Sequence, residues 1–212
     1  MKHLIILGAG GMGRQVFLFA KNCKGYQTEY VIKGFLDDDP YANKGYEGFP
    51  PVLGTIGGYE IQPDDVFFNS IGSVVAKKKC INKILEKGGE FITLIHPTAE
   101  ISKGTKIGRG CMISPRAGIG TETEIGDFCL IQDNAIIGHD VRVGNFCRID
   151  CNVVLIAGVK LEDEVCVHTS SVINHNVRIG EGATVGALSF VIRNVKPGTT
   201  VQGNPAKKIV YE

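Results

Sequence analysis

The second half of the chain is organised by a repeat of six residues. An aliphatic residue (Ile, Leu or Val) stands at every sixth position from Ile95 to Val191, through seventeen positions without a gap. Four residues after each stands a small or β-branched residue, such as Cys129 or Val165. A period of six matches neither a helix nor a simple alternation, and it describes short strands separated by corners. Such strands bury their side chains only by stacking, so the pattern predicts a parallel β-helix from residue 95 to about residue 196.

Residues 1–94 show a different pattern, in which apolar runs alternate with amphipathic ones. The apolar run 2–7 is followed by the turn Gly8-Ala9-Gly10-Gly11-Met12-Gly13 and by an amphipathic run over residues 14–22. This order predicts a strand, a glycine turn and a helix. Such a turn lets backbone amides approach a phosphate group at a helix N-terminus, where the helix dipole favours negative charge. The turn therefore indicates a phosphorylated ligand.

Three more strands are predicted in this part, over residues 30–36, 66–71 and 90–95, with a helix over residues 74–87. The strand over residues 30–36 ends in Asp37-Asp38-Asp39, at the carboxyl edge of the sheet, where the ribose or base of a nucleotide would lie. Four strands are too few for a complete dinucleotide domain. We therefore expect an α/β, Rossmann-like half-domain that binds one nucleotide.

Charge and cysteine content narrow the partners and the compartment. The 23 Lys and Arg residues nearly balance the 22 Asp and Glu residues, for a net charge of +1 and a pI near 7.6, so no strong field attracts nucleic acid or an anionic membrane. No apolar run approaches the length of a membrane span, and the glycine turn stands where a signal peptide would be apolar. We expect a cytoplasmic protein whose 7 cysteines are reduced.

The six-residue pattern resembles the hexapeptide repeat of the left-handed β-helix acyltransferases. In that family three hexads form one triangular coil, so eighteen residues advance the helix by one strand spacing of about 4.8 Å. On this resemblance the seventeen hexads make between five and six coils. Cys111, Cys129 and Cys147 then lie one coil apart, and we expect them to form an internal ladder of small apolar side chains without a redox role.

The two parts together resemble a narrower group: the sugar O-acyltransferases of the sialic acid type and the bacterial N-acetyltransferases of UDP- or GDP-linked 4-amino-4,6-dideoxy sugars. The resemblance implies a nucleotide-sugar-binding domain over residues 1–94 and a left-handed β-helix acyltransferase domain with a C-terminal tail over residues 95–212. It implies an acyl-CoA donor, acetyl-CoA in most members, no metal, and a homotrimer with sites at the subunit boundaries. The sugar, the nucleotide and the choice between N- and O-acylation stay open.

One histidine has the surroundings of a general base. Acyl transfer from a thioester to an amine or hydroxyl needs a base, and a neutral imidazole suits this step. His139 stands at a predicted corner beside Asp140, whose carboxylate can orient the ring and stabilise its protonated form. The segment 136–140 also resembles the family segment that carries the catalytic base and its acidic helper. We therefore predict that His139 is the base and Asp140 its helper, and we expect His168 and His175 to be surface residues.

The resemblance also implies two sets of binding residues. In the first domain the glycine turn would hold the phosphates of the nucleotide sugar, and the strand-end acids would contact its ribose or base. This set is Gly8, Gly10, Gly13, Asp37 and Asp38, with Asn69, Gly72 and Ser73 nearby. In the β-helix the acyl donor would lie in a groove between neighbouring copies, against Arg148, Ala157, Gly158, Gly186, Ala187, Lys207 and Lys208. Arg148 stands where many N-acetyltransferases of the group have a second histidine, and it can contact a carboxylate or a phosphate.

Two other functions stay open at this point. The first is a metal-dependent hydratase resembling the γ-class carbonic anhydrases, because His139 and His175 lie two coils apart on one face. Gly180, however, stands at the position of the third ligand, and histidines about 9.6 Å apart cannot share one zinc ion without another subunit. The second is a noncatalytic nucleotide-sugar-binding homologue, which Arg148 in place of a histidine makes conceivable.

Overall fold

The structure is a computed structural model that describes residues 1–209; the last three residues of the predicted second domain lie outside the described residues. The chain divides into two compact units, Met1–Leu94 and Ile95–Glu212. No helix in the described part of the chain is long and apolar enough to cross a membrane.

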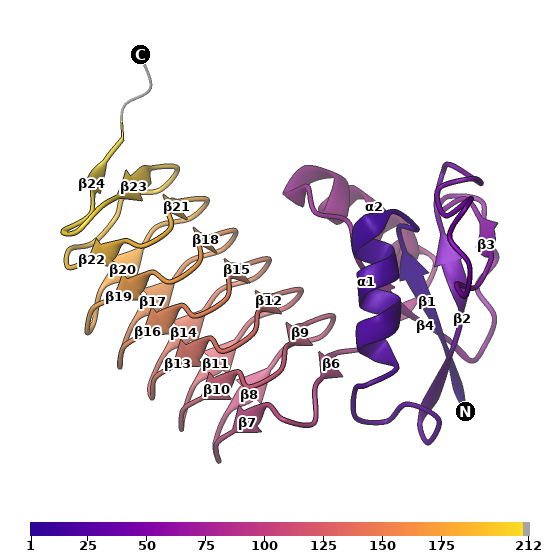
Figure 1. The fold of residues 1–212 in the computed structure, drawn as a ribbon, viewed down its shortest axis with the longest axis horizontal. Coiled ribbons are helices and arrows are strands. Elements are labelled where there is room, and N and C mark those ends of the chain that lie inside the picture. The colour runs from indigo at the N-terminus through magenta and orange to yellow at the C-terminus, as the bar shows by residue number, and fades with distance from the viewer. Residues whose placement is uncertain (210–212) are drawn as a thin grey trace. The chain divides into compact units, whose positions relative to one another are not determined.

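The N-terminal unit is built on a five-stranded parallel sheet in the order β3-β2-β1-β4-β5 (Figure 1). Its elements are β1 (Lys2–Leu7), α1 (Gly11–Ala20), β2 (Tyr30–Leu36), β3 (Val52–Gly54), β4 (Asp65–Asn69), α2 (Val74–Glu86) and β5 (Glu90–Phe91). This order matches the first five positions of the doubly wound order 3-2-1-4-5-6, which confirms the Rossmann-like α/β fold. In β1, all four residues from Leu4 to Leu7 are fully buried, as expected for a strand covered on both faces.

Two expectations about this unit were wrong. The three-residue strand β3 was not predicted. The strand expected over residues 90–95 is instead two short strands, β5 and β6 (Leu94–Ile95), and β6 pairs within the β-helix sheets.

The second unit is a three-sided parallel β-helix, whose coils follow one another along the chain in Figure 1. The first side consists of β7 (Glu100–Ile101), β10 (Gly118–Ile119), β13 (Ile136–Ile137), β16 (Val154–Leu155), β19 (Val172–Ile173) and β22 (Phe190–Val191). The second side consists of β8 (Lys106–Ile107), β11 (Glu124–Ile125), β14 (Arg142–Val143), β17 (Lys160–Leu161) and β20 (Arg178–Ile179). The third side consists of β6, β9 (Met112–Ile113), β12 (Leu130–Ile131), β15 (Arg148–Ile149), β18 (Cys166–Val167), β21 (Thr184–Val185), β23 (Thr200–Gln202) and β24 (Lys207–Lys208).

The eighteen-residue coil sets the register of all three sides. Ile119 pairs with Ile137, and Ile131 pairs with Ile149, in each case one coil further along the chain. These aliphatic side chains form one continuous buried core, in which Ile131 and Ile149 have no exposed surface. The predicted parallel β-helix is confirmed. Among the strands of residues 1–209, only β24 runs antiparallel to its neighbour, β23, and this reversal closes the last coil.

The cysteine ladder is also confirmed. Cys111, Cys129 and Cys147 are buried inside the β-helix, and the backbone amide of Cys129 lies 3.4 Å from the sulfur of Cys111. Each thiol also donates to the backbone carbonyl of the residue fifteen positions further along the chain. The thiol of Cys129, for example, donates to the carbonyl oxygen of Gly144 at 3.0 Å. The contact with Cys129 and burial together raise the pKa of the Cys111 thiol well above its usual value, so this thiol stays protonated and inert.

Candidate functional site

The glycine turn of the N-terminal unit leaves the start of α1 open to a ligand. Gly10 is the N-cap of α1, no side chain caps the helix, and no acidic residue stands in its first turn. A side chain at exposed Gly10 would meet no atom within 4 Å. By contrast, a Cβ at Gly13 would lie 2.0 Å from the carbonyl oxygen of Gly8, so Gly13 is required for close packing. The unpaired amides and the positive end of the helix dipole favour an anion here.

The two acids predicted to contact ribose or base make hydrogen bonds within the protein. Asp37 accepts from the amide of Ala9 in the glycine turn at 2.8 Å and from the amide of Asp39 at 2.9 Å. Asp38 accepts from the amide of Ile56 at 3.3 Å. Asp37 therefore fixes the glycine turn against the end of β2, and its contact with a nucleotide stays a prediction.

The end of β4 lies beside the glycine turn, because Asn69 pairs with Leu7 in the register of the sheet. The amide nitrogen of Asn69 donates to the carbonyl of Ile71 at 3.3 Å, whereas its Oδ1 atom is buried and has no hydrogen-bond partner. A buried acceptor without a partner is costly, and a ligand N–H or O–H group would satisfy it.

Gly72 and Ser73 follow the same strand. A Cβ at Gly72 would meet no atom within 4 Å, so the backbone here is open to a ligand. Ser73 is the N-cap of α2, and its hydroxyl accepts from the amide of Ala76 at 3.5 Å.

Sequence reasoning missed a cation beside the glycine turn. The Arg14 side chain donates to the carbonyl of Ala9 at 3.3 Å and to that of Ala42 at 3.4 Å. Its guanidinium carbon lies 3.5 Å from the ring centroid of Tyr46, a cation–π contact that holds the charge in place. No motif links residues 14 and 46, so only the fold shows this arrangement.

His139 and Asp140 lie at the corner that follows the first side of the β-helix. The ring atom Nδ1 of His139 lies 2.7 Å from a carboxylate oxygen of Asp140, and both side chains are 63% exposed. Asp140 adopts φ +57°, which turns the chain sharply at this corner. With Nδ1 directed at the carboxylate, Nε2 of His139 can accept a proton from a substrate.

Two of the predicted donor-binding residues stack directly on this corner. Ala157 and Gly158 lie one coil after His139, and the amide of Gly158 donates to the carbonyl of His139 at 3.1 Å. The neighbour on the other side is Gly120, where a Cβ would lie 2.7 Å from the backbone nitrogen of His139. We call residues 120–123, 138–141, 156–159 and 174–177 the His139 corner.

The other predicted donor-binding residues lie on the third side of the β-helix. Arg148 begins β15, while Gly186 and Ala187 follow β21 at the next corner. We call this corner, residues 132–135, 150–153, 168–171 and 186–189, the Asp150 corner. It precedes the first side of the β-helix, whereas the His139 corner follows that side, so the strands of the first side lie between these two groups of residues.

His168 lies at the surface, as expected, but it makes a contact that we did not predict. It is partly buried at the Asp150 corner, and its Nδ1 atom lies 2.9 Å from a carboxylate oxygen of Asp150, whose side chain is only 5% exposed. The signal was present in the sequence, because the two residues are eighteen positions apart and therefore neighbours in successive coils. His175, in contrast, is exposed as expected.

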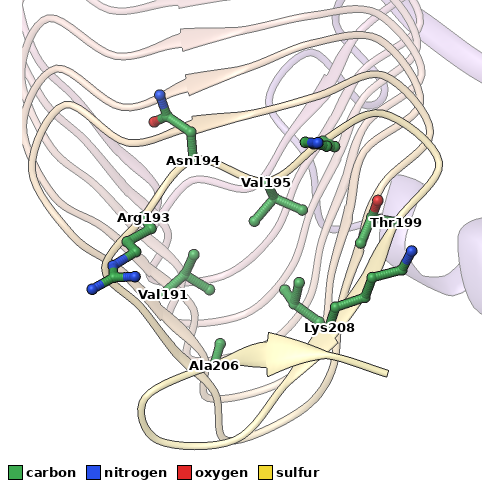
Figure 2. A pocket seen from close by; sticks show the side chains of 9 residues that line it. Val191, Arg193, Asn194, Val195, Thr199, Ala206 and Lys208 are labelled. Carbon is green, nitrogen blue, oxygen red and sulfur yellow. The ribbon is translucent and has the colours of Figure 1, made fainter. Parts of the chain in front are cut away.

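Lys207 and Lys208 form β24 at the end of the β-helix, and both are exposed. Lys208 borders a pocket of about 320 Å³ on the last coil (Figure 2). The pocket is lined by Val191, Arg193, Asn194, Val195, Lys196, Thr199, Val201, Ala206 and Lys208. Its residues come from the final coil and its closing strands, so it does not include His139.

The described residues offer no site for a metal ion. Within residues 1–209, no three His, Cys, Asp or Glu side chains gather closely enough to hold one. The hydratase alternative thus has no ligand set in a single chain.

Comparison with known proteins identifies both parts of the chain. Residues 3–84 match the PglD N-terminal domain, and residues 91–172 match the GMPPB C-terminal domain. Over 117 residues, which make up 53% of this chain, the sequence is 28% identical to a UDP-N-acetylbacillosamine N-acetyltransferase of Bacillus subtilis (strain 168). The match spans about half of that relative's length, 51%.

Two solved structures resemble the whole chain. The acetyltransferase domain of PglB from Neisseria gonorrhoeae FA1090 has a TM-score of 0.88 at 25% identity, over 99% of this chain and 100% of that one. PerB from Caulobacter crescentus, in complex with CoA and GDP-perosamine, has a TM-score of 0.87 at 25% identity, over 99% of this chain and 98% of that one.

A PglD-type N-terminal domain joined to a three-sided parallel β-helix is the fold that this chain shares with the acetyltransferase domain of PglB and with PerB. The chain is a homologue of these proteins, related to the Bacillus enzyme in sequence and to PglB and PerB in fold.

Proposed function

We propose that the chain transfers an acyl group, acetyl in the first instance, from an acyl-CoA to the amino group of a nucleotide-linked amino sugar. The Bacillus relative is an N-acetyltransferase of a UDP-linked sugar, the PglB relative is an acetyltransferase domain, and PerB was solved with CoA and GDP-perosamine. The observation that carries the proposal is the exposed His139 ring at 2.7 Å from Asp140, on the corner of a β-helix of this class.

In the proposed reaction the sugar amine attacks the carbonyl carbon of the thioester. Nε2 of His139 takes the proton that the amine nitrogen loses, while Asp140 holds the ring by Nδ1 and stabilises the imidazolium that forms. The C–S bond then breaks, and the leaving thiolate of CoA takes up the proton. The products are an N-acyl sugar and free CoA.

The proposed nucleotide site is the glycine turn of the N-terminal unit. The uncapped start of α1 would bind the diphosphate, with the positive charge of Arg14 close by. The unpaired Oδ1 atom of Asn69 would accept a hydrogen bond from the nucleotide. Gly10 and Gly72 supply open backbone around these groups, since a Cβ at either would meet no atom within 4 Å.

We also propose that the chain forms a homotrimer whose donor site is shared. His139 and Arg148 flank opposite edges of the first side of the β-helix, and in the resembling family the acyl donor lies between neighbouring copies, so we propose that the two residues border one acyl-CoA from two copies. This is tested by mixing the purified His139→Asn and Arg148→Ala variants, allowing their subunits to exchange, and measuring the transferase activity of the mixture. Activity that returns in the mixture supports a shared site, and a mixture as inactive as its parts contradicts it.

The acyl donor and the seven free cysteines are consistent with our proposal of a cytoplasmic enzyme. The region of Lys207 and Lys208 would meet the 3′-phosphate of CoA. Dephospho-CoA, which lacks that phosphate, should then bind more weakly than CoA to the native protein and equally well to the double Lys→Ala variant.

The test of the reaction is release of the CoA thiol from acetyl-CoA with a panel of UDP- and GDP-linked amino sugars. His139→Asn should lower kcat by about 10²- to 10⁴-fold, the usual contribution of a general base. His175→Asn is the matched control, since His175 is exposed at the same corner two coils further on and has no carboxylate bonded to its ring among residues 1–209. A panel without turnover but with nucleotide binding would favour the noncatalytic homologue.

A further inference from the structure

One corner of the β-helix carries an unbroken line of four polar side chains, whereas the corner after the second side is rich in glycine. At the His139 corner the residue after each inward aliphatic residue is Gly120, Gly138, Ile156 or Asn174, with no ionisable group among them. At the Asp150 corner the same positions are Ser114, Gln132, Asp150 and His168, followed by Gly186. Successive members lie one coil apart, about 4.8 Å along the axis. None of these four polar residues has a role in the reaction proposed above.

The centre of this line is a buried carboxylate with two partners. One oxygen of Asp150 accepts from Nε of Arg148 at 2.5 Å, and the other lies 2.9 Å from Nδ1 of His168. The Asp150 side chain is 5% exposed, against 51% for Arg148 and 39% for His168. A buried charge must be paired and hydrogen-bonded to be tolerated, and here the two partners occupy both oxygens.

The thiol next to this cluster is not arranged as a nucleophile. The sulfur of Cys166 lies 3.8 Å from Nδ1 and 3.7 Å from Nε2 of His168. Nearly equal and long distances to both nitrogens mean that the sulfur makes no short hydrogen bond to either one. Burial and then the charge of Asp150 raise the pKa of this thiol, against the opposing effect of Arg148. A cysteine nucleophile needs a lowered pKa, because the thiolate is the reactive form.

The cluster instead fixes a guanidinium group. Arg148 uses its Nε atom for Asp150, and its two terminal nitrogens make no hydrogen bond to any of the described residues. A guanidinium held in this way presents a planar pair of donors that matches a phosphate. His168 prevents Asp150 from turning away, because it occupies the second carboxylate oxygen.

We propose that Asp150 and His168 are positioning residues that hold Arg148 as the binding group for a phosphate of one of the two substrates. The inference rests on the proposed function, in which the acyl-CoA and the nucleotide sugar both carry a diphosphate. Arg148 contacts the ligand, and the other two residues act through it.

The histidine can be tested with a matched pair of amides. In His168→Asn the side-chain N–H replaces the Nδ1–H group that faces Asp150, whereas in His168→Gln it replaces Nε2–H, one bond further out. His168→Gln should raise the KM of one substrate about tenfold or more, with kcat changed less than about threefold. His168→Asn should restore a KM close to that of the native protein. Equal KM values for both variants and the native protein would overturn the role of His168.

The variant Arg148→Lys shows which substrate carries the bound phosphate, because lysine keeps the positive charge but loses the planar pair of donors. A higher KM for acyl-CoA assigns the phosphate to the donor, and a higher KM for the nucleotide sugar assigns it to the acceptor. If neither KM changes, the proposal is wrong. Thermal denaturation of each variant identifies any that fails to fold, and Asp150 is left intact because its loss would leave the cluster unpaired.

The same variants separate this inference from the proposed function. Calorimetric titration of CoA, UDP and GDP needs no turnover, so it tests Arg148 even if every acceptor in the panel is inactive. Arg148→Lys should weaken binding of CoA or of the nucleoside diphosphates about tenfold or more, and His168→Gln should weaken binding of the same ligand. Unchanged binding of all three ligands by Arg148→Lys would overturn the inference, whatever the transferase assay shows.

Discussion

Replacing Gly10 by Ala separates the folding role of the glycine turn from its binding role. Gly10 adopts φ −67° and ψ −165°, a conformation open to alanine, and its added methyl group would meet no atom within 4 Å. The backbone therefore needs no shift. Gly→Ala at a compatible position stabilises a protein by about 0.4–1 kcal/mol, because the unfolded chain loses freedom. We expect Gly10→Ala to melt at or slightly above the temperature of the native protein.

The same methyl group occupies the space through which a phosphate would reach the start of α1. A hydrogen bond to a charged group contributes about 1.5–3 kcal/mol, so losing one should raise the Kd for UDP or GDP roughly 10- to 150-fold. Isothermal titration with both nucleotides measures this change. Gly118→Ala is the control, since Gly118 lies in β10 of the other unit and its methyl group would also meet no atom within 4 Å.

A Gly10→Ala protein that binds both nucleotides as tightly as the native chain would refute the phosphate site. Gly13→Ala provides the contrast, because its methyl group would lie 2.0 Å from the carbonyl oxygen of Gly8. Gly13→Ala should therefore lower the free energy of unfolding, and any loss of nucleotide binding should follow from this loss of stability. A stable Gly13→Ala protein would mean that the turn relaxes more freely than its packing suggests.

Three further predictions concern stability and thiol chemistry. Ile149→Ala, at a position with no exposed surface, should destabilise the β-helix by about 2–5 kcal/mol in urea denaturation, and a smaller loss would indicate collapse around the cavity. Cys129 should react with a thiol reagent only after unfolding, so labelling of the native protein there would contradict its burial. Asp65 loses solvation on burial, but its bonds to Lys33 and neighbouring groups outweigh this and lower its pKa. Its stabilisation is therefore complete above the unfolded pKa of about 4 and is lost as pH falls through the folded pKa; Asp65→Asn should destabilise at pH 7, and the difference from the native protein should shrink in acid.

The sequence predicted most accurately those elements that its periodicity defines. The strands 2–7 and 30–36 have the predicted bounds, and every inward aliphatic position of the hexads lies on a strand. The predicted start of the first helix, Arg14, was three residues late, since glycine is a poor helix former and the helix nevertheless begins at Gly11. β3 has only three residues, each half-buried, and too few positions to show an alternation.

The candidate site was predictable where it follows a motif and not where it depends on side-chain partners. His139 beside Asp140 follows from adjacency and from the corner that the hexads define. The bond from Asp37 to the glycine turn does not, because twenty-eight residues separate its partners. Asn69 could be placed at a strand end, but its unpaired oxygen depends on everything that packs around it.

The eighteen-residue coil has a further consequence for how function is distributed over this chain. Residues eighteen apart touch, as Asp150 and His168 do, so chemistry can accumulate along one corner of the β-helix. Residues on different corners are separated by the strands of the side between them, and backbone hydrogen bonds between coils hold those strands in register. The shared donor site that we propose would place the base of one copy beside the guanidinium of another. If subunit exchange restores activity, oligomerisation contributes to the reaction and is not only a source of stability.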